Sequence, residues 1–375
     1  ALAIRAFDYF TLVQLYQFNY KGHEDAPGVP IITPENAEEA AANGCARSTV
    51  KETYEFILGD LNKAIELLAN TKKTRSDKRY VSLDVAYGIR ARVHLTMHNY
   101  ADALKDAEAA LASTSSVPYS SAAVSKPTFI DIEDASWMWG ILITDKDRVS
   151  TTGICNFPSH MGSLNYGYAS VGGWRRISPK LYNQIPESDV RKGWFLDDTG
   201  VSVNLPAAAQ AYITKKGAPV YTQVKYGPMN DEWGSNNNAT DVILMRVEEM
   251  YLIKAEAQAM NNDVSGGVNT LNSFVNTYRD PSYKCTATTG EAVQEAVWHQ
   301  RRIEFWGEGL AYFDIMRLNK GVNRLGCGFP KTAVFNIAAG DPVQIYSIPN
   351  KEVQYNPLLE NNPLVSAPTP IPDEE

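Results

Sequence analysis

Two glutamates have the spacing that could support catalysis. Glu304 and Glu308 are four residues apart, so a helix would carry both carboxylates on one face. Paired carboxylates serve as acid and nucleophile in glycoside hydrolases. However, Arg301, Arg302 and Arg317 lie within helical or hairpin reach of the two carboxylates and could hold them in ion pairs. We therefore interpret both glutamates as structural and predict no catalytic residue.

A pair of histidines has a spacing that can bind a metal ion. His94 and His98 are also four residues apart, but metal binding at this spacing needs a third ligand. No glutamate follows His94 to complete an H-E-x-x-H pattern, so we interpret both as surface or packing residues and predict no metal site. The sequence contains no G-x-S-x-G, P-loop or G-x-G-x-x-G motif, and no calcium loop of the form D-x-[DN]-x-[DN]-G. No cofactor is predicted.

A glycine-rich loop carries side chains of a different kind. Asn165, Tyr166 and Tyr168 are followed closely by Trp174 and Arg175, with glycines between them. Sugars present apolar C–H faces that stack on aromatic rings, and hydroxyls that need fixed hydrogen-bond partners. We predict that these five residues contact a sugar ligand.

A second candidate loop lies at residues 230–238. Trp233 stands there among several amides, one of which is Asn236, and we predict that both contact the same ligand. Alternatively, the rings of Trp174 and Trp233 pack these loops against a scaffold, and the sequence leaves this open. The remaining tryptophans in apolar or strand-like runs are predicted to be core residues: Trp137, Trp139 and Trp194.

Composition narrows the class of protein. The chain has 375 residues, 44% of them hydrophobic, which is enough for a large core. Its net charge of −8 argues against the broad basic surface that nucleic acid binding requires. The four cysteines form no C-x-x-C pair and are expected to be free thiols. No apolar run reaches the ~18 residues of a membrane span. Residue 1 falls inside a helical pattern without a cap, so we expect the natural start to lie upstream.

Helical periodicity dominates both ends of the chain. Helices are predicted at residues 1–16, 49–68, 83–97, 100–112, 242–260, 268–278, 291–306 and 310–318. Small residues at Ala91, Ala103, Ala107 and Ala110, with Tyr100 at a turn, match the tetratricopeptide pattern. The predicted fold is mostly α, with tetratricopeptide-like helix pairs forming an α-α superhelical scaffold.

Between the helical parts the periodicity is lost. Glycine, asparagine, serine and proline accumulate over residues 118–240, which predicts an irregular, loop-rich insert that carries the ligand site. We therefore expect a single domain over 1–375, with a scaffold at 1–117 and 241–320. The proline-rich residues 321–375 are expected to form an irregular wrap.

Three sequence motifs occur in an order that resembles one family. The segment R-V-E-E-M-Y-L-I-K-A-E-A at 246–257 is similar to a conserved helix of the SusD/RagB family of outer-membrane nutrient-binding lipoproteins. The residues Q-R-R-I-E-F-W-G-E-G at 300–309, with F-D-I-M-R at 313–317, resemble its "E-R-R-x-E-F-x-x-E-G" hairpin. The closing I-P-N-K-E at 348–352, with N-P-L at 356–358 and N-N-P at 361–363, resembles its C-terminal motif. Gln300, Leu310 and Asn361 depart from the usual pattern.

The resemblance implies more than the residues alone do. It implies cell-surface binding of an oligosaccharide or polysaccharide and its delivery to a SusC-like TonB-dependent transporter. It also implies a lipid anchor upstream of residue 1, on the outer face of the outer membrane, and it marks Asp189 and Arg191 as a structural D-x-R pair. Calcium occurs in this family. The alternatives are uptake of a non-glycan nutrient, or a tetratricopeptide-type scaffold that binds a peptide or protein partner.

Overall fold

The computed structural model describes residues 1–147, 150 and 156–372, which leaves Cys155 outside the described part. Cys45, Cys285 and Cys327 are free thiols, as predicted. The described residues are mostly helical, in agreement with the predicted fold class. By their contacts they form two compact units. The first comprises residues 1–73, 86–106 and 309–375, and the second comprises residues 74–85 and 107–308.

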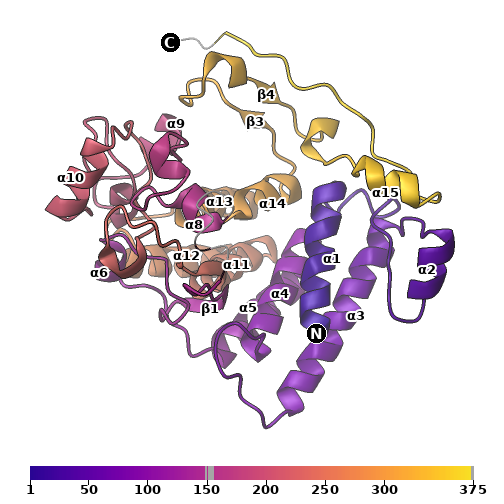
Figure 1. Ribbon diagram of the computed structural model, residues 1–375. Helices are drawn as coiled ribbons and strands as arrows, with labels where there is room; N and C mark the ends of the chain where they lie inside the picture. The colour runs from indigo at the N-terminus through magenta and orange to yellow at the C-terminus, as the bar shows by residue number, and fades with distance from the viewer. Residues whose placement is uncertain (148–149, 151–155, 373–375) are drawn as a thin grey trace. The chain divides into compact units, whose positions relative to one another are not determined.

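Six of the eight predicted helices lie within two residues of the observed bounds (Figure 1). The predicted helix at 268–278 begins four residues earlier, at Val264. The first unit contains α1 (Leu2–Tyr16), α2 (Ala37–Asn43), α3 (Val50–Asn70), α14 (Leu310–Arg317) and α15 (Asn350–Tyr355). The second contains α6 (Ser121–Val124), α8 (Phe157–Met161), α9 (Pro179–Tyr182), α10 (Ala207–Lys215), α11 (Val247–Met260), α12 (Val264–Tyr278) and α13 (Gly290–Glu304). α4 (Leu83–Thr96) and α5 (Tyr100–Ser113) have residues in both units. No helix in the described part of the chain is long and apolar enough to cross a membrane.

Short strands complete the secondary structure. β1 (Trp137–Ile141) pairs antiparallel with β2 (Val242–Arg246) in the second unit, and β3 (Val322–Asn323) pairs with β4 (Asn336–Ile337) in the first. The predicted helix at 242–260 is therefore wrong over its first five residues. Val242, Ile243 and Leu244 are apolar or β-branched residues that suit a strand, and pairing with β1 keeps α11 from starting before Val247.

In the first unit, α1 lies against α3 (Figure 1). α3 begins with a capping box, in which Thr49 and Glu52 each satisfy a backbone N–H of the other. Arg5 on α1 donates two hydrogen bonds of 2.7 Å to the carboxylate of Asp60 on α3. The C-terminal segment joins this pair because Asn362 donates to the carbonyl oxygen of Tyr16, 2.7 Å away. One asparagine of the closing motif therefore has a structural role.

The two histidines also have packing roles in the first unit. His94 Nε2 lies 3.8 Å from Asp106, and burial lowers the pKa of the imidazole. His98 stacks on Tyr100, and its Nε2 lies 2.9 Å from the carbonyl oxygen of Arg317. Both side chains therefore contribute to packing, as the sequence predicted.

In the second unit, α11 packs against both α12 and α13 (Figure 1). Small residues allow this contact: a Cβ at Gly267 of α12 would come within 2.6 Å of the carbonyl oxygen of Ala255 and 2.8 Å of the Ala259 side chain. This close approach of paired helices is compatible with the tetratricopeptide-like pairing that the sequence predicted.

A buried ionic cluster joins residues at or next to the ends of these helices to residues of the loop-rich segment. It contains four basic side chains and four carboxylates, which balance in charge: Arg191, Lys225, Arg246, Arg279, Asp189, Glu248, Glu304 and Glu308. Glu304 is its central acceptor, with Arg279 at 2.7 Å, Arg246 at 3.0 Å and Arg191 at 3.3 Å. Glu308 accepts from Lys225 at 2.6 Å and from Arg246 at 2.9 Å.

The cluster confirms the structural interpretation of the two glutamates but corrects their partners. Arg301 pairs with Glu249 at 3.5 Å, and Arg317 pairs with Asp314 at 2.8 Å. The cations that hold Glu304 and Glu308 come from segments far away in sequence, which helical spacing alone does not reveal. Arg191 binds Asp189 at 2.6 Å, as predicted for the D-x-R pair.

Removing the central carboxylate will destabilise the protein strongly. In Glu304→Gln, three buried guanidinium groups lose an anionic acceptor, and breaking a buried ion pair on one side costs about 3–5 kcal/mol. We expect a loss of that size in the free energy of unfolding, measured by denaturant titration. Glu108→Ala removes the more exposed ion pair with Lys254 in the same unit and should change stability by less than about 1 kcal/mol. Equal losses in the two variants would contradict the role of the cluster.

The cluster also predicts acid sensitivity. Burial alone would raise the pKa of both glutamates, but Arg279, Arg246 and Arg191 hold the pKa of Glu304 well below its ordinary value of 4.5. Arg246 and Lys225 likewise lower the pKa of Glu308. A lowered carboxylate pKa in the folded state contributes stability that is present above 4.5 and is lost as the pH falls through the folded-state value. Melting temperature should therefore fall below about pH 4.5, and less steeply in Glu308→Gln than in the wild type.

Candidate functional site

The predicted loops meet on one apolar cluster of the second unit. Its buried members are Leu164, Leu196, Ala209, Ile213 and Val224. Trp174, Tyr212 and Trp233 are partly buried and pack against it. Trp174 and Trp233 come from the two predicted loops, whereas Tyr212 comes from α10. The structure therefore brings together the rings of two loops and one helix.

Backbone hydrogen bonds hold the two loops side by side. The N–H of Tyr166 donates to the carbonyl oxygen of Ser235 at 2.8 Å, and the N–H of Gly234 donates to that of Leu164 at 2.8 Å. The hydroxyl of Tyr212 adds a bond of 3.1 Å to the carbonyl oxygen of Asn165. These contacts fix the first loop relative to the second and to α10.

Two tyrosines of the first loop are exposed. Tyr166 is 52% exposed, and the ammonium group of Lys216 lies 5.6 Å from its ring centre and 5.7 Å from that of Tyr212. Tyr168 is 46% exposed, and its ring lies 5.0 Å from that of His160. We call Tyr166, Tyr168, Trp174, Tyr212 and Trp233 the aromatic surface.

The other predicted residues have different environments. Arg175 is half-buried, and its Nε donates to the carbonyl oxygen of His160 at 3.1 Å, so its guanidinium supports the segment on which Tyr168 rests. Asn236 is exposed at the edge of the second loop. Asn165 is buried, and its amide donates to Asn238 at 3.1 Å, so its side chain lies beneath the surface. The ligand-binding roles of all seven predicted residues stay predictions.

The three tryptophans predicted for the core are buried. Trp137, Trp139 and Trp194 are 0%, 5% and 1% exposed. Trp174 and Trp233 pack on the apolar cluster, as the alternative interpretation expected, and both residues are partly exposed. Their contact with a ligand stays a prediction.

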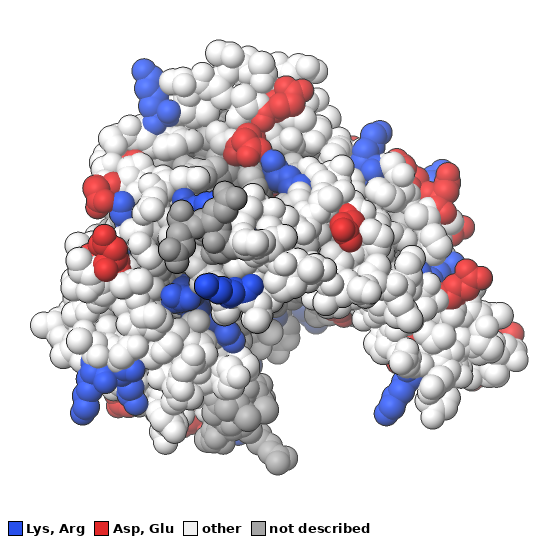
Figure 2. Space-filling model, turned by 90° about the horizontal axis from the view of Figure 1, so that it is seen from above, with Lys and Arg blue, Asp and Glu red and all other residues white. Residues whose placement is uncertain are grey.

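Charge on the molecular surface is mixed. On the face that Figure 2 shows, acidic and basic side chains are interspersed among large uncharged areas.

Two family models match this chain. The model described as "SusD family" matches residues 188–364, and the model described as "Starch-binding associating with outer membrane" matches residues 1–95. The range of the first match contains all eight residues of the ionic cluster. The chain belongs to the SusD family.

Relatives of this SusD family member include proteins from several bacteria. "SusD-like protein P2" of Formosa agariphila is 24% identical over 353 residues, which are 84% of this chain and 64% of that protein. This chain therefore spans less than two thirds of that relative. A "SusD-like carbohydrate binding protein" from Bacteroides vulgatus has 24% identity and a TM-score of 0.76, over 96% of this chain and 75% of the other. A SusD superfamily protein from Bacteroides thetaiotaomicron has 22% identity and a TM-score of 0.78, over 97% and 77%. These structures establish the fold.

Sequence reasoning about this SusD family member missed one side chain of the aromatic surface, Tyr212, and two beside it, Lys216 and His160. Tyr212 and Lys216 belong to or follow α10, and His160 belongs to α8. The apolar spacing of Ala209, Tyr212 and Ile213 is a helical signal inside the predicted insert that could have revealed α10. The contact between His160 and Tyr168 has no comparable signal, because it depends on how the loop folds.

Gly234→Ala tests the packing of the second loop. Gly234 has a φ of +83°, and an added Cβ would lie 2.6 Å from the Tyr212 ring, so both strain and a clash oppose the substitution. Gly217→Ala is the matched control, because Gly217 has a φ of +69° and nothing within 4 Å. We expect the control to cost about 1–2 kcal/mol from backbone strain and Gly234→Ala to cost about 1–3 kcal/mol more. Equal unfolding free energies for the two variants would contradict the contact.

Proposed function

We propose that this protein captures an oligosaccharide or polysaccharide at the cell surface and delivers it to a SusC-like TonB-dependent transporter. Membership of the SusD family supports this proposal, as does the description of one matching family model as starch-binding and associated with the outer membrane. In the same proposal, a lipid anchor holds the protein on the outer face of that membrane. The name of one structural neighbour, a carbohydrate binding protein, is in keeping with the ligand class.

The aromatic surface is the observation that carries the proposal. Tyr166 and Tyr168 are about half exposed, and Trp174 and Trp233 are fixed on the apolar cluster with part of each ring accessible. Rings anchored in this way bind the C–H face of a sugar with little loss of side-chain entropy. Asn236 and Lys216 stand beside them as polar side chains for hydroxyl groups.

We propose binding without cleavage. The two glutamates with hydrolase-like spacing are buried and held by several cations, so neither can reach a glycosidic bond. A surface that binds by stacking and a few hydrogen bonds gives modest affinity, and modest affinity permits release into a transporter. Capture and release therefore need no chemical step.

Loss of one exposed ring should weaken glycan binding. Tyr168→Ala should lower affinity for a bound polysaccharide about five- to thirtyfold, which corresponds to about 1–2 kcal/mol for one stacked ring. Trp174→Ala should have at least the same effect. Affinity gel electrophoresis against host and plant glycans measures this retention, and melting temperature verifies that each variant is folded.

Tyr355→Ala is the matched control. Tyr355 is 85% exposed in the first unit and is not part of the aromatic surface, so its loss should leave retention unchanged. Full retention of every glycan ligand by both Tyr168→Ala and Trp174→Ala would contradict the proposal. Release of reducing sugar from the retained polysaccharide would contradict the non-catalytic role.

A further inference from the structure

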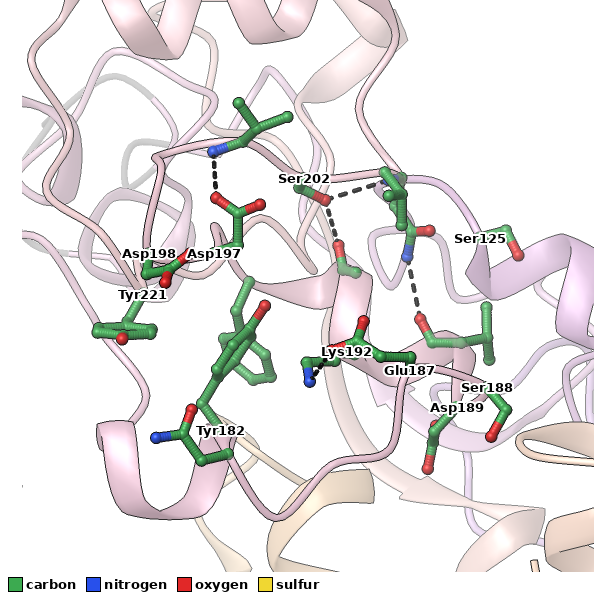
Figure 3. A pocket seen from close by; sticks show the side chains of 17 residues that line it. Ser125, Tyr182, Glu187, Ser188, Asp189, Lys192, Asp197, Asp198, Ser202 and Tyr221 are labelled. Carbon is green, nitrogen blue, oxygen red and sulfur yellow. Dashed lines mark hydrogen bonds and ion pairs between the residues drawn. The ribbon is translucent and has the colours of Figure 1, made fainter. Parts of the chain in front are cut away.

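A separate pocket of about 500 Å³ lies in the second unit, within the size range of small-molecule sites. Figure 3 shows its lining, which includes two tyrosines, Tyr182 and Tyr221, and the neighbouring carboxylates Asp197 and Asp198. None of the seven side chains predicted for the ligand site, all of them described, lines this pocket. It is therefore distinct from the aromatic surface.

The polypeptide around the pocket is fixed by local hydrogen bonds. Asp197 Oδ1 accepts from the N–H of Thr199 at 2.8 Å, from its hydroxyl at 2.7 Å and from the N–H of Val201 at 2.9 Å. The backbones of Leu196 and Tyr221 are also joined, because the N–H of Tyr221 donates to the carbonyl oxygen of Leu196 at 3.0 Å. These hydrogen bonds fix the turn at residues 197–201 in position relative to Tyr221.

Tyr182 supplies a polar group inside the pocket. The side chain is only 8% exposed, and Figure 3 shows its hydroxyl directed into the pocket, toward the side where Asp197 lies. Among the described residues, no hydrogen-bond partner takes up this hydroxyl. Burial, followed by the charges of Asp197, Glu187 and Asp198, raises the pKa of Tyr182 to about 12, so the hydroxyl keeps its proton.

The charges around the pocket do not balance. Glu187 is paired with Lys192, and Asp189 is paired with Arg191, so these four side chains cancel. Asp197 and Asp198 have no basic partner among the ion pairs of the described residues. Although burial opposes it, the hydrogen bonds from Val201 and Thr199 lower the pKa of Asp197, which is therefore charged at neutral pH. The pocket carries two uncompensated negative charges.

The ring faces provide the apolar part of the site. The rings of Tyr182 and Tyr221 are 5.1 Å apart and tilted by 57°, so they form an angled wall. The ammonium group of Lys192 lies 5.1 Å from the centre of the Tyr182 ring and covers part of this wall. Such a wall fits the C–H face of a sugar ring, and the carboxylates and the Tyr182 hydroxyl fit its hydrogen-bonding edge. A metal ion is a poorer occupant, because no group of three or more His, Cys, Asp or Glu residues in the described chain is placed to hold one.

We propose that this pocket binds an amino sugar whose amine is free and protonated. The ammonium group pairs with Asp197 and Asp198, and the sugar ring lies against Tyr182 and Tyr221. The positive charge of the amine is complementary to the negative charge of the pocket, and the apolar face of the sugar ring is complementary to the two tyrosine rings. This site stands on its own contacts and does not depend on the aromatic surface.

Titration calorimetry with single sugars tests the proposal directly. At about pH 6, where an aliphatic amine is protonated, glucosamine should bind at least about tenfold more tightly than N-acetylglucosamine, which lacks the charge. Ethylammonium, which has the charge without the ring, should also bind at least about tenfold more weakly than glucosamine. Equal binding of glucosamine and either comparison ligand would overturn the proposal.

Variants locate the binding in the pocket. Asp198→Asn removes an exposed carboxylate without a packing change and should weaken glucosamine binding about tenfold. Tyr182→Phe keeps the ring and removes only the hydroxyl, so it should weaken binding by a smaller factor. Tyr168→Ala, on the aromatic surface, should leave glucosamine affinity unchanged. Unchanged affinity in Asp198→Asn would contradict this site, whereas failure of the polysaccharide test above would leave the glucosamine result intact.

Discussion

The buried ionic cluster around Glu304 is the constraint on which the second unit depends. Glu304 at the end of α13 joins Arg246 at the end of β2, directly before α11, with Arg279 after α12 and Arg191 in the insert. One carboxylate therefore ties three helices to the loop-rich part of the chain. Charges that are fully buried are tolerated only when they are paired, so the segments that carry them cannot separate without a large cost. Through Arg191 and Lys225 the cluster attaches two points of the mostly irregular insert to α13 and the residues that follow it.

Fixed attachment of the loops is what the proposed recognition surface requires. Trp174 and Trp233 rest on an apolar cluster, and backbone hydrogen bonds join their loops, so the rings are positioned before any ligand arrives. Preorganised rings lose little entropy on binding, which suits the capture and release that we propose. The pocket of Tyr182 and Asp197 is built in the same way, from a turn closed by its own side chain.

Much of the fold followed from the sequence because its signals are local. Helical periodicity placed both ends of α3 within two residues, and the apolar runs of Trp137 and Trp194 correctly indicated the core. The predictions that were wrong or incomplete depend on contacts between segments that are distant in sequence. Residues 242–246 form a strand only because β1 lies beside them, and Glu304 binds cations from three distant segments that helical spacing could not identify. The loops around Tyr166 and Trp233 were chosen by residue type, whereas Tyr212 and the acidic pocket appear only once the chain is folded.

The central claim is that a glycan lies against rings carried by these loops and leaves uncleaved. The most direct measurement is a crystal structure of the protein soaked with an oligosaccharide that it retains in affinity gels. The account predicts an intact chain of sugar rings stacked on Tyr168 or Trp174. A ligand bound far from the aromatic surface and from the Tyr182 pocket, or only its hydrolysed fragments, would contradict it.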